Sequence, residues 1–111
     1  RVEREEFLNV GVIVFCKRKH FLAVKYHLDQ QRLQAFAGEV DLEELTAYLD
    51  TWALISAGSP AGGRIAQLDA PSRFRWLTAT RSTIIQSSRV HPGITADPAA
   101  ELEDLFAKYV L

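Results

Sequence analysis

The sequence contains a single cysteine, Cys16, among 111 residues, so no disulfide bond can form within the chain. This low cysteine content is typical of proteins from a reducing compartment, and we expect a cytoplasmic location. The longest apolar run, Val10 to Cys16, is far too short to span a bilayer, and no basic-then-apolar signal segment opens the chain. We therefore expect no membrane contact.

Neither sign of charge dominates, because 13 Lys and Arg oppose 14 Asp and Glu, for a formal net charge of −1. The field of the whole protein therefore does not favour nucleic acid or anionic membrane, although a local patch could do so. The chain is 48% hydrophobic and 24% charged, which is the balance of an ordinary globular domain. We expect one domain over residues 1–111, long enough to bury a stable core without disulfide bonds or metal ions.

Two apolar stretches predict a β-hairpin over residues 7–16 and 21–28, joined by the polar tip 17–20. In FLNVGVIVFC, the alternate residues from Leu8 to Cys16 share one apolar face. In FLAVKYHL, the alternate residues from Leu22 to Leu28 share a face, and Lys25 and His27 point the other way. This pattern indicates a hairpin with one core face.

Three aspartates mark helix starts. Asp29 precedes a short helical segment, and Asp97 precedes Pro98 at the start of a helix over 98–110. Asp41, with Glu44 three residues later, makes a capping-box variant before a helix over 42–56.

A third strand and two irregular segments complete the expected fold. STIIQSS predicts a strand over 82–88, the glycine-rich stretch 57–63 predicts a flexible linker, and His91-Pro92-Gly93 is typical of a type II turn. A further helix start is expected at Pro71-Ser72. The fold class is therefore α+β, with a small antiparallel sheet covered by helices on at least one face.

The region around the third strand holds the densest hydrogen-bonding capacity. Its polar side chains are Arg75, Arg81, Ser82, Thr83, Gln86, Ser88 and His91. On a strand, alternate residues share a face about 7 Å apart, so an anionic ligand or a partner's carboxylate could bind across the row between Arg81 and His91. The alternative is a solvated strand face, with an arginine that ties a helix end to the sheet, and the residues alone favour that alternative.

Asn9 and Gly11 form a second unusual feature, because an amide beside a missing side chain leaves a dent in a strand. A ligand or another backbone could approach there. The more common explanation for such a glycine is a bulge or a tight contact with a helix.

Signals for metal or covalent chemistry are weak. The histidines lack metal-binding spacing and Cys16 has no CxxC partner, so we predict no metal and no cofactor. A triad of Ser82 or Ser88 with His91 and Asp97 can be drawn, but no nucleophile elbow supports it.

Two blocks resemble a bacterial family catalogued as domain of unknown function 3037. They are EFLNVGVIVF (Glu6 to Phe15) and RFRWLTATRSTIIQSSRVHPGITADPAAELEDLF (Arg73 to Phe106). The resemblance implies a bacterial cytoplasmic protein, no known activity or cofactor, and a partner role beside a HipA-like kinase. It also implies an additional strand before Arg1, whose absence would expose a sheet edge and allow self-association. It singles out Glu6, Asn9, Gly11, Arg81, Ser82, Thr83, Gln86 and His91.

We therefore expect a non-catalytic binding or accessory module whose surface combines Asn9 and Gly11 with residues 81–91. Arg81 would hold an acidic group, neighbouring polar side chains would orient it, and His91 would make the interaction sensitive to pH.

Two alternatives stay open. One is a small enzyme for a phosphorylated or carboxylated substrate, with His91 as general acid or base. The other is a nucleic-acid binder that uses the basic tip 17–20 with Arg1 and Arg4. A charged hairpin tip is more often simply solvated.

Overall fold

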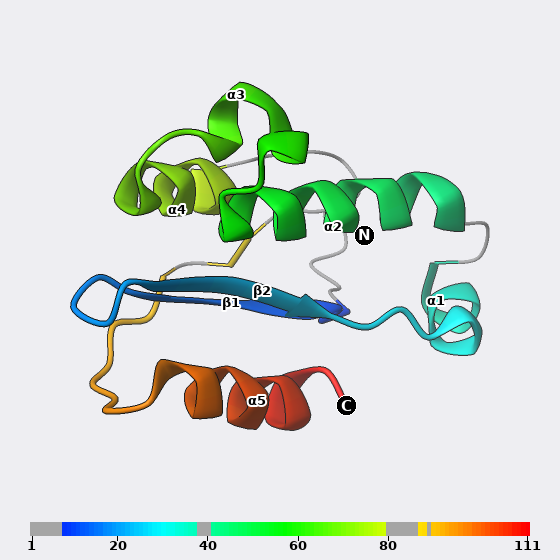
Figure 1. Ribbon diagram of the computed structural model, residues 1–111. Helices are drawn as coiled ribbons and strands as arrows, with labels where there is room; N and C mark the ends of the chain where they lie inside the picture. The colour runs from blue at the N-terminus through cyan, green and yellow to red at the C-terminus, as the bar shows by residue number, and fades with distance from the viewer. Residues whose placement is uncertain (1–7, 38–40, 80–86, 89) are drawn as a thin grey trace.

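The computed structural model describes residues 8–37, 41–79, 87–88 and 90–111. Its elements, in chain order, are β1 (Gly11–Cys16), β2 (Phe21–Tyr26), α1 (Gln30–Ala37), α2 (Leu42–Ala57), the 3-10 helix η2 (Pro60–Gly62), α3 (Gly63–Ala66), α4 (Ala70–Ala79) and α5 (Pro98–Tyr109). The predicted α+β class is confirmed. Figure 1 shows three layers: α2, α3 and α4 lie on one side of the sheet, and α5 lies on the other.

The sheet consists of β1 and β2, paired antiparallel from Gly11 opposite Tyr26 to Cys16 opposite Phe21. Opposite residues share a face, so Ile13 and Val24 point toward α2. The predicted third strand is only partly described, because residues 82–86 lie outside the described ranges. Ser87 and Ser88 are described and are not in a strand.

Both faces of the hairpin are covered by helices, so the prediction of a single core face is wrong. On the second face Lys25 pairs with Glu103 of α5, and its ammonium lies 4.8 Å from the centre of the Phe106 ring. The remaining residues of that face, such as Val14 and Ala23, are apolar and need a cover. The single lysine does not prevent packing, because its apolar stem lies along α5 while its charge reaches Glu103.

The main core lies between α2 and the sheet. Its most buried side chains are Leu33, Leu45, Leu49, Trp52, Ile55, Ala66 and Leu77. Leu77, on α4, is 0% exposed. Burying a side chain of this size contributes about 1.5–3 kcal/mol, so these residues hold α2, α3 and α4 together on one face of the sheet.

The three predicted aspartate caps are confirmed. Asp29 accepts from the backbone N–H groups of residues 31 and 32, and Asp41 accepts from Glu44 N at 3.0 Å. Asp97 accepts from Ala100 N at 3.1 Å. Each carboxylate satisfies backbone donors that a helix start would otherwise leave free.

Three local expectations need correction. The stretch 57–63 is not a flexible linker, because Gly58 ends α2 with φ 69° and η2 follows directly. Gly93 does not have the positive φ that a type II turn requires. Helix α4 begins at Ala70, because the carboxylate of Asp69 accepts from Ser72 N at 2.8 Å and so caps it one residue earlier than predicted.

Candidate functional site

The residues predicted to form a binding surface divide into two groups. Five of them, Glu6, Arg81, Ser82, Thr83 and Gln86, lie outside the described residues, so the proposed meeting of Gly11 with the polar strand stays a prediction. The other four, Asn9, Gly11, Arg75 and His91, are described and lie in three different places.

Gly11 contacts the neighbouring strand and leaves no dent for a ligand. A Cβ atom built on Gly11 would lie 2.8 Å from Lys25 O and 3.0 Å from Tyr26 Cβ. The space of the missing side chain is therefore filled by the neighbouring strand β2, and not by a helix as the more common explanation expected. This contact accounts for the glycine, and a role of Gly11 in a binding surface stays a prediction.

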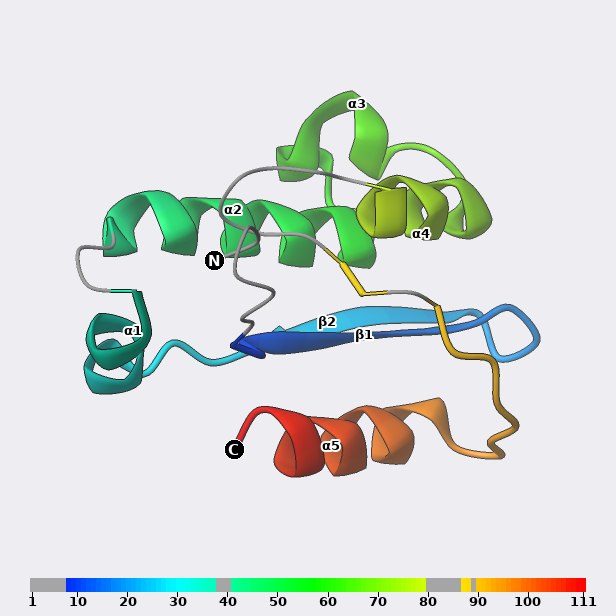
Figure 2. The same ribbon diagram turned by 180° about the vertical axis from the view of Figure 1, so that it is seen from behind.

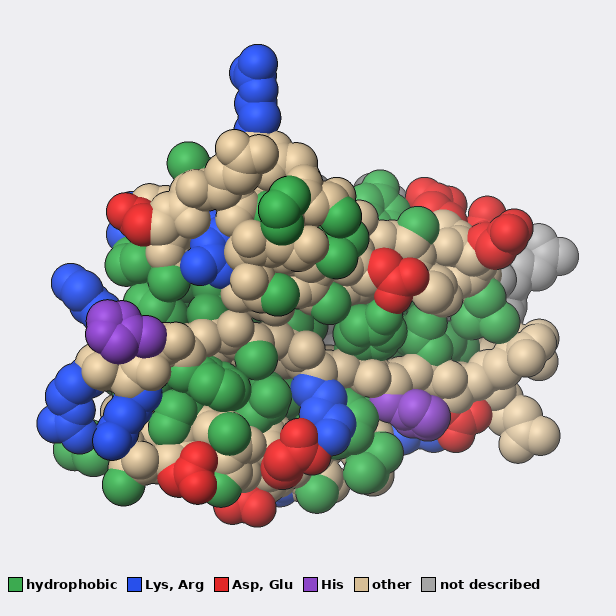
Figure 3. Space-filling view, in the orientation of Figure 1, with side chains coloured by type: hydrophobic (Ala, Val, Ile, Leu, Met, Phe, Trp, Pro, Cys, Tyr) green, Lys and Arg blue, Asp and Glu red, His purple; other side chains and the backbone are tan. Residues whose placement is uncertain are grey.

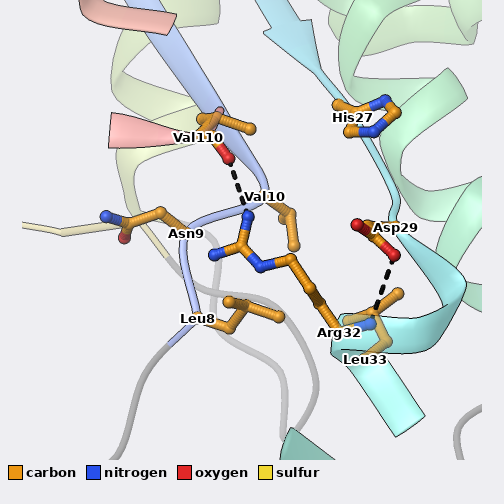
Figure 4. Close-up of a pocket in the computed structure, with 8 residues that line it drawn as sticks. All are labelled: Leu8, Asn9, Val10, His27, Asp29, Arg32, Leu33 and Val110. Atoms are coloured by element: carbon orange, nitrogen blue, oxygen red, sulfur yellow. Dashed lines mark hydrogen bonds between the residues drawn. The ribbon is translucent and has the colours of Figure 1, made fainter. Parts of the chain in front are cut away.

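Asn9 borders a small hollow between the start of β1, α1 and the end of α5, drawn in Figure 4. Arg32 donates from Nη1 to Val110 O at 3.1 Å across this hollow. His27 and Asp29 lie on its other side, where Asp29 also caps α1. The hollow measures about 10 Å³, which is room for one water molecule and too little for a ligand. We interpret Arg32 here as a cap on the carbonyl of Val110, the C-cap residue of α5.

Arg75 and His91 lie at the opposite end of the sheet from Asn9. Phe74 stacks on Phe15 with ring centroids 4.9 Å apart, which places α4 beside the hairpin end of β1. Figure 2 shows segment 90–97 passing β1 at this same end. Arg75 and His91 are both exposed.

The hairpin tip adds four more polar residues to this end. Residues 17–20 form a turn in which His20 N donates to Lys17 O at 3.1 Å and His20 has φ 53°. All four are exposed, and Figure 3 shows Lys, Arg and His side chains gathered there. We call residues 17–20, Arg75 and His91 the basic end. The sequence does not show that the tip and Arg75 share one end of the sheet, because this depends on the stacking of Phe74 on Phe15.

Arg75 is exposed at the basic end, whereas Arg73, two residues earlier, holds three backbone carbonyls. Arg75 donates from Nη2 to Ser72 Oγ at 3.0 Å. Arg73 donates from Nη1 to Ile55 O and Ser56 O at 2.9 and 2.7 Å, and from Nε to Leu68 O at 2.9 Å. This role of Arg73 could not be predicted, because nothing local in RFRW shows which arginine reaches the end of α2.

Asp69, which both arginines influence electrostatically, already caps α4. Hydrogen bonds from the side chain and backbone N–H of Ser72 lower the pKa of Asp69, and the charges of Arg75 and Arg73 lower it further. The hydrogen bond described for Arg75 uses one of its five N–H groups, so other donors can meet another acidic group.

The described part of the chain offers few signs of other chemistry. It contains no group of three or more His, Cys, Asp or Glu side chains placed to hold a metal ion. Within the same residues no helix is both long and apolar enough to cross a membrane. Cys16 is a free, half-buried thiol at the end of β1.

Comparison with known proteins gives one match. A family model described as protein of unknown function (DUF3037) matches residues 1–110. No curated protein and no solved structure matches the chain.

Proposed function

Because the chain belongs to the DUF3037 family, whose description gives no activity, we propose a function from its surface: a non-catalytic module that binds an acidic group of a partner at the basic end. The observation that carries this proposal is the exposed basic tip 17–20 (Figure 3), with the exposed Arg75 of α4 and His91 of segment 90–97 at the same end of a chain with net charge −1. A cluster of cations in a nearly neutral protein creates a local field that the composition hides.

Arg75 suits this role because of its guanidinium group. The planar fork of donors matches a carboxylate in two parallel hydrogen bonds, and the described contact to Ser72 Oγ uses only one of its five N–H groups. Single exposed ion pairs contribute about 0–1 kcal/mol, so one acidic residue would bind too weakly. The partner therefore presents several acidic residues to the whole basic end.

The sequence-based candidates Arg81, Ser82, Thr83 and Gln86 follow α4 directly in the chain and remain part of the proposal. Arg81 would add a second guanidinium, and the hydroxyl and amide groups would orient the acidic group. The resemblance noted above makes a HipA-like kinase a candidate partner. A bacterial, cytoplasmic setting is part of the same proposal.

Binding is favoured over catalysis because of the exposure of His91. General acid–base catalysis needs a group within hydrogen-bonding reach of the reacting atoms, usually in a pocket that excludes water. His91 is exposed on segment 90–97 and does not line the hollow beside Asn9. A catalytic His91 would therefore need a partner or substrate to close around it.

The proposal is tested by charge reversal. Lys17→Glu combined with Lys19→Glu, and separately Arg75→Glu, should each weaken binding of a fluorescent poly-glutamate peptide by about tenfold or more at low salt. The matched control for Arg75→Glu is Lys108→Glu, which replaces one cation with one carboxylate on α5 at the far end of the molecule. Equal weakening by the control, or no binding to the wild type at low salt, would refute the proposal.

Nucleic-acid binding is the second candidate, and the exposed tip 17–20 is the observation that favours it. The same titration with duplex and single-stranded DNA distinguishes nucleic-acid binding from binding of an acidic protein partner. Each phosphate contact adds a slope of about −0.9 in log K against log salt for duplex DNA, so tip-dependent binding of DNA in preference to poly-glutamate would select this candidate.

A further inference from the structure

The outer edge of β2 presents unpaired backbone groups. His27 N donates to Val10 O at 2.8 Å, next to the Gly11–Tyr26 pair. Because hydrogen-bonded and non-hydrogen-bonded pairs alternate in an antiparallel ladder, residues 21, 23 and 25 bond to β1. The N–H and C=O groups of Leu22, Val24 and Tyr26 therefore point away from β1. Within the described ranges no residue forms a hydrogen bond with them.

This edge lies open on one face of the molecule. Figure 3 shows backbone running from the hairpin tip across that face, with hydrophobic side chains on both sides of it. Segment 90–97 passes on the other side of the sheet, beside β1 (Figure 2). Unpaired strand edges of this kind bind extended peptides, because the ladder of backbone bonds can simply continue.

The helices decide what can occupy the edge. Helix α2 packs against β2, whereas α5 packs mainly against β1, so α2 stands over the outer strand. A second copy of the chain, added through its own β2, would bring its α2 beside the first at about the strand spacing of 4.8 Å. A helix is about 10 Å wide with its side chains, so the two helices would collide. The edge can therefore accept an extended segment that has no helix packed over it.

The charge of the surroundings changes along the β2 edge and favours one orientation of a bound segment. β2 begins at the basic tip and ends at Tyr26, whose hydroxyl donates to Asp50 of α2. Beyond that end lie Asp29 and the acidic first turn of α2, Glu43 and Glu44. A segment that pairs antiparallel with β2 ends at the basic tip, and antiparallel pairing is the more stable arrangement.

We propose that β2 binds an extended apolar segment of a partner protein, paired antiparallel and followed by acidic residues that reach the hairpin tip. The acidic residues belong to the acidic group of the proposed function, so the charge part of this inference rests on that function. The strand addition rests on the β2 edge alone.

The experiment uses the whole chain and a synthetic peptide with six alternating valines and threonines followed by three aspartates. Amide hydrogen exchange measured by NMR reads out the pairing directly. Binding should slow the exchange of the Leu22, Val24 and Tyr26 amides, whereas the amides of Ala23 and Lys25, already bonded to β1, should change little. Unchanged exchange at Leu22, Val24 and Tyr26 under saturating peptide overturns the proposal.

A second peptide tests the direction. Placing the three aspartates before the alternating residues should weaken binding by about tenfold, because an antiparallel segment then brings its acids to Asp29 and α2. Equal affinity of the two peptides would overturn the proposed orientation.

A protein variant separates this inference from the proposed function. If Lys17→Glu with Lys19→Glu weakens peptide binding while the three outward amides remain unprotected, strand addition is refuted and the proposed function stands. If those amides are protected and the charge reversal has no effect, the acidic requirement and the proposed function are refuted together. Protection combined with loss of affinity in the variant supports both.

Discussion

Gly11 lies directly opposite Tyr26, with so little space between the strands that a Cβ on Gly11 would come within 3.0 Å of Tyr26 Cβ. The other near atom, Lys25 O at 2.8 Å, belongs to the backbone, which cannot rotate away as a flexible side chain can. The glycine thus sets the separation of β1 and β2 at this end of the sheet.

Gly11→Ala is therefore expected to destabilise the protein by about 1–3 kcal/mol, as overpacking does in other well-packed sites. Urea denaturation followed by circular dichroism measures the change. Gly93→Ala is the matched control, because nothing lies within 4 Å of its added Cβ and its φ is not positive. Equal stability of the two variants would show that β1 and β2 can move apart to accept the added methyl group without a loss of folding free energy.

Arg73→Ala should lower the free energy of unfolding by about 2–3 kcal/mol, because three backbone carbonyls lose a charged donor at once. Arg73→Lys should recover only part of this loss, since an ammonium cannot reproduce the fork. Arg75→Ala, two residues away and exposed, should change stability by no more than about 0.5 kcal/mol. A similar loss in both alanine variants would contradict the assignment of different roles.

Tyr26→Phe should cost about 0.5–1.5 kcal/mol at neutral pH, the net contribution of one hydrogen bond to Asp50. The bond to Asp50 raises the pKa of Tyr26, with burial and the negative charge of Asp50 acting in the same direction. The folded state therefore keeps the phenol proton at a pH where the unfolded chain has lost it.

The wild type should consequently lose stability as the pH rises above the ordinary tyrosine pKa of 10.0, and this loss should be smaller in Tyr26→Phe. Denaturation at a series of pH values from neutral to alkaline tests this. Parallel curves for the two proteins would show that the phenol is not held neutral by folding.

Asp69→Asn should remove an acid sensitivity while it keeps the helix cap. The pKa of Asp69 is lowered, so its contribution to stability is present above the ordinary value of 3.8 and is lost as the pH falls through the lower folded value. Asparagine caps helices about as well as aspartate, so the variant should match the wild type at neutral pH. It should lose less stability than the wild type in acid, and thermal melts between pH 2 and 7 compare them.

Local sequence signals predicted the helices well, because their starts depend on nearby residues. Asp29, Asp41 and Asp97 each cap within three residues of their own position. The sequence predicted the hairpin equally well, since β1 and β2 are runs rich in β-branched and aromatic residues separated by a polar turn. Such features require no knowledge of distant parts of the chain.

The errors concern relationships across long sequence distances. The covering of the second sheet face depends on α5, about 80 residues from the lysine that it meets. The stacking of Phe74 on Phe15 brings Arg75 to the hairpin end, and neither residue indicates this locally. Gly11 shows the same limit. A glycine in a strand can leave an open dent or make room for a close neighbour, and only the position of Tyr26 shows which of the two applies here.

The guanidinium of Arg73 also links parts of the chain that would otherwise open independently. It holds carbonyls at the end of α2 and the carbonyl of Leu68 just before α4, so fraying at either place breaks bonds at the other. Helix ends usually exchange their amide hydrogens early, ahead of the rest of a domain. Here the last turn of α2 and the first turn of α4 should behave as one cooperative unit whose exchange rates rise and fall together.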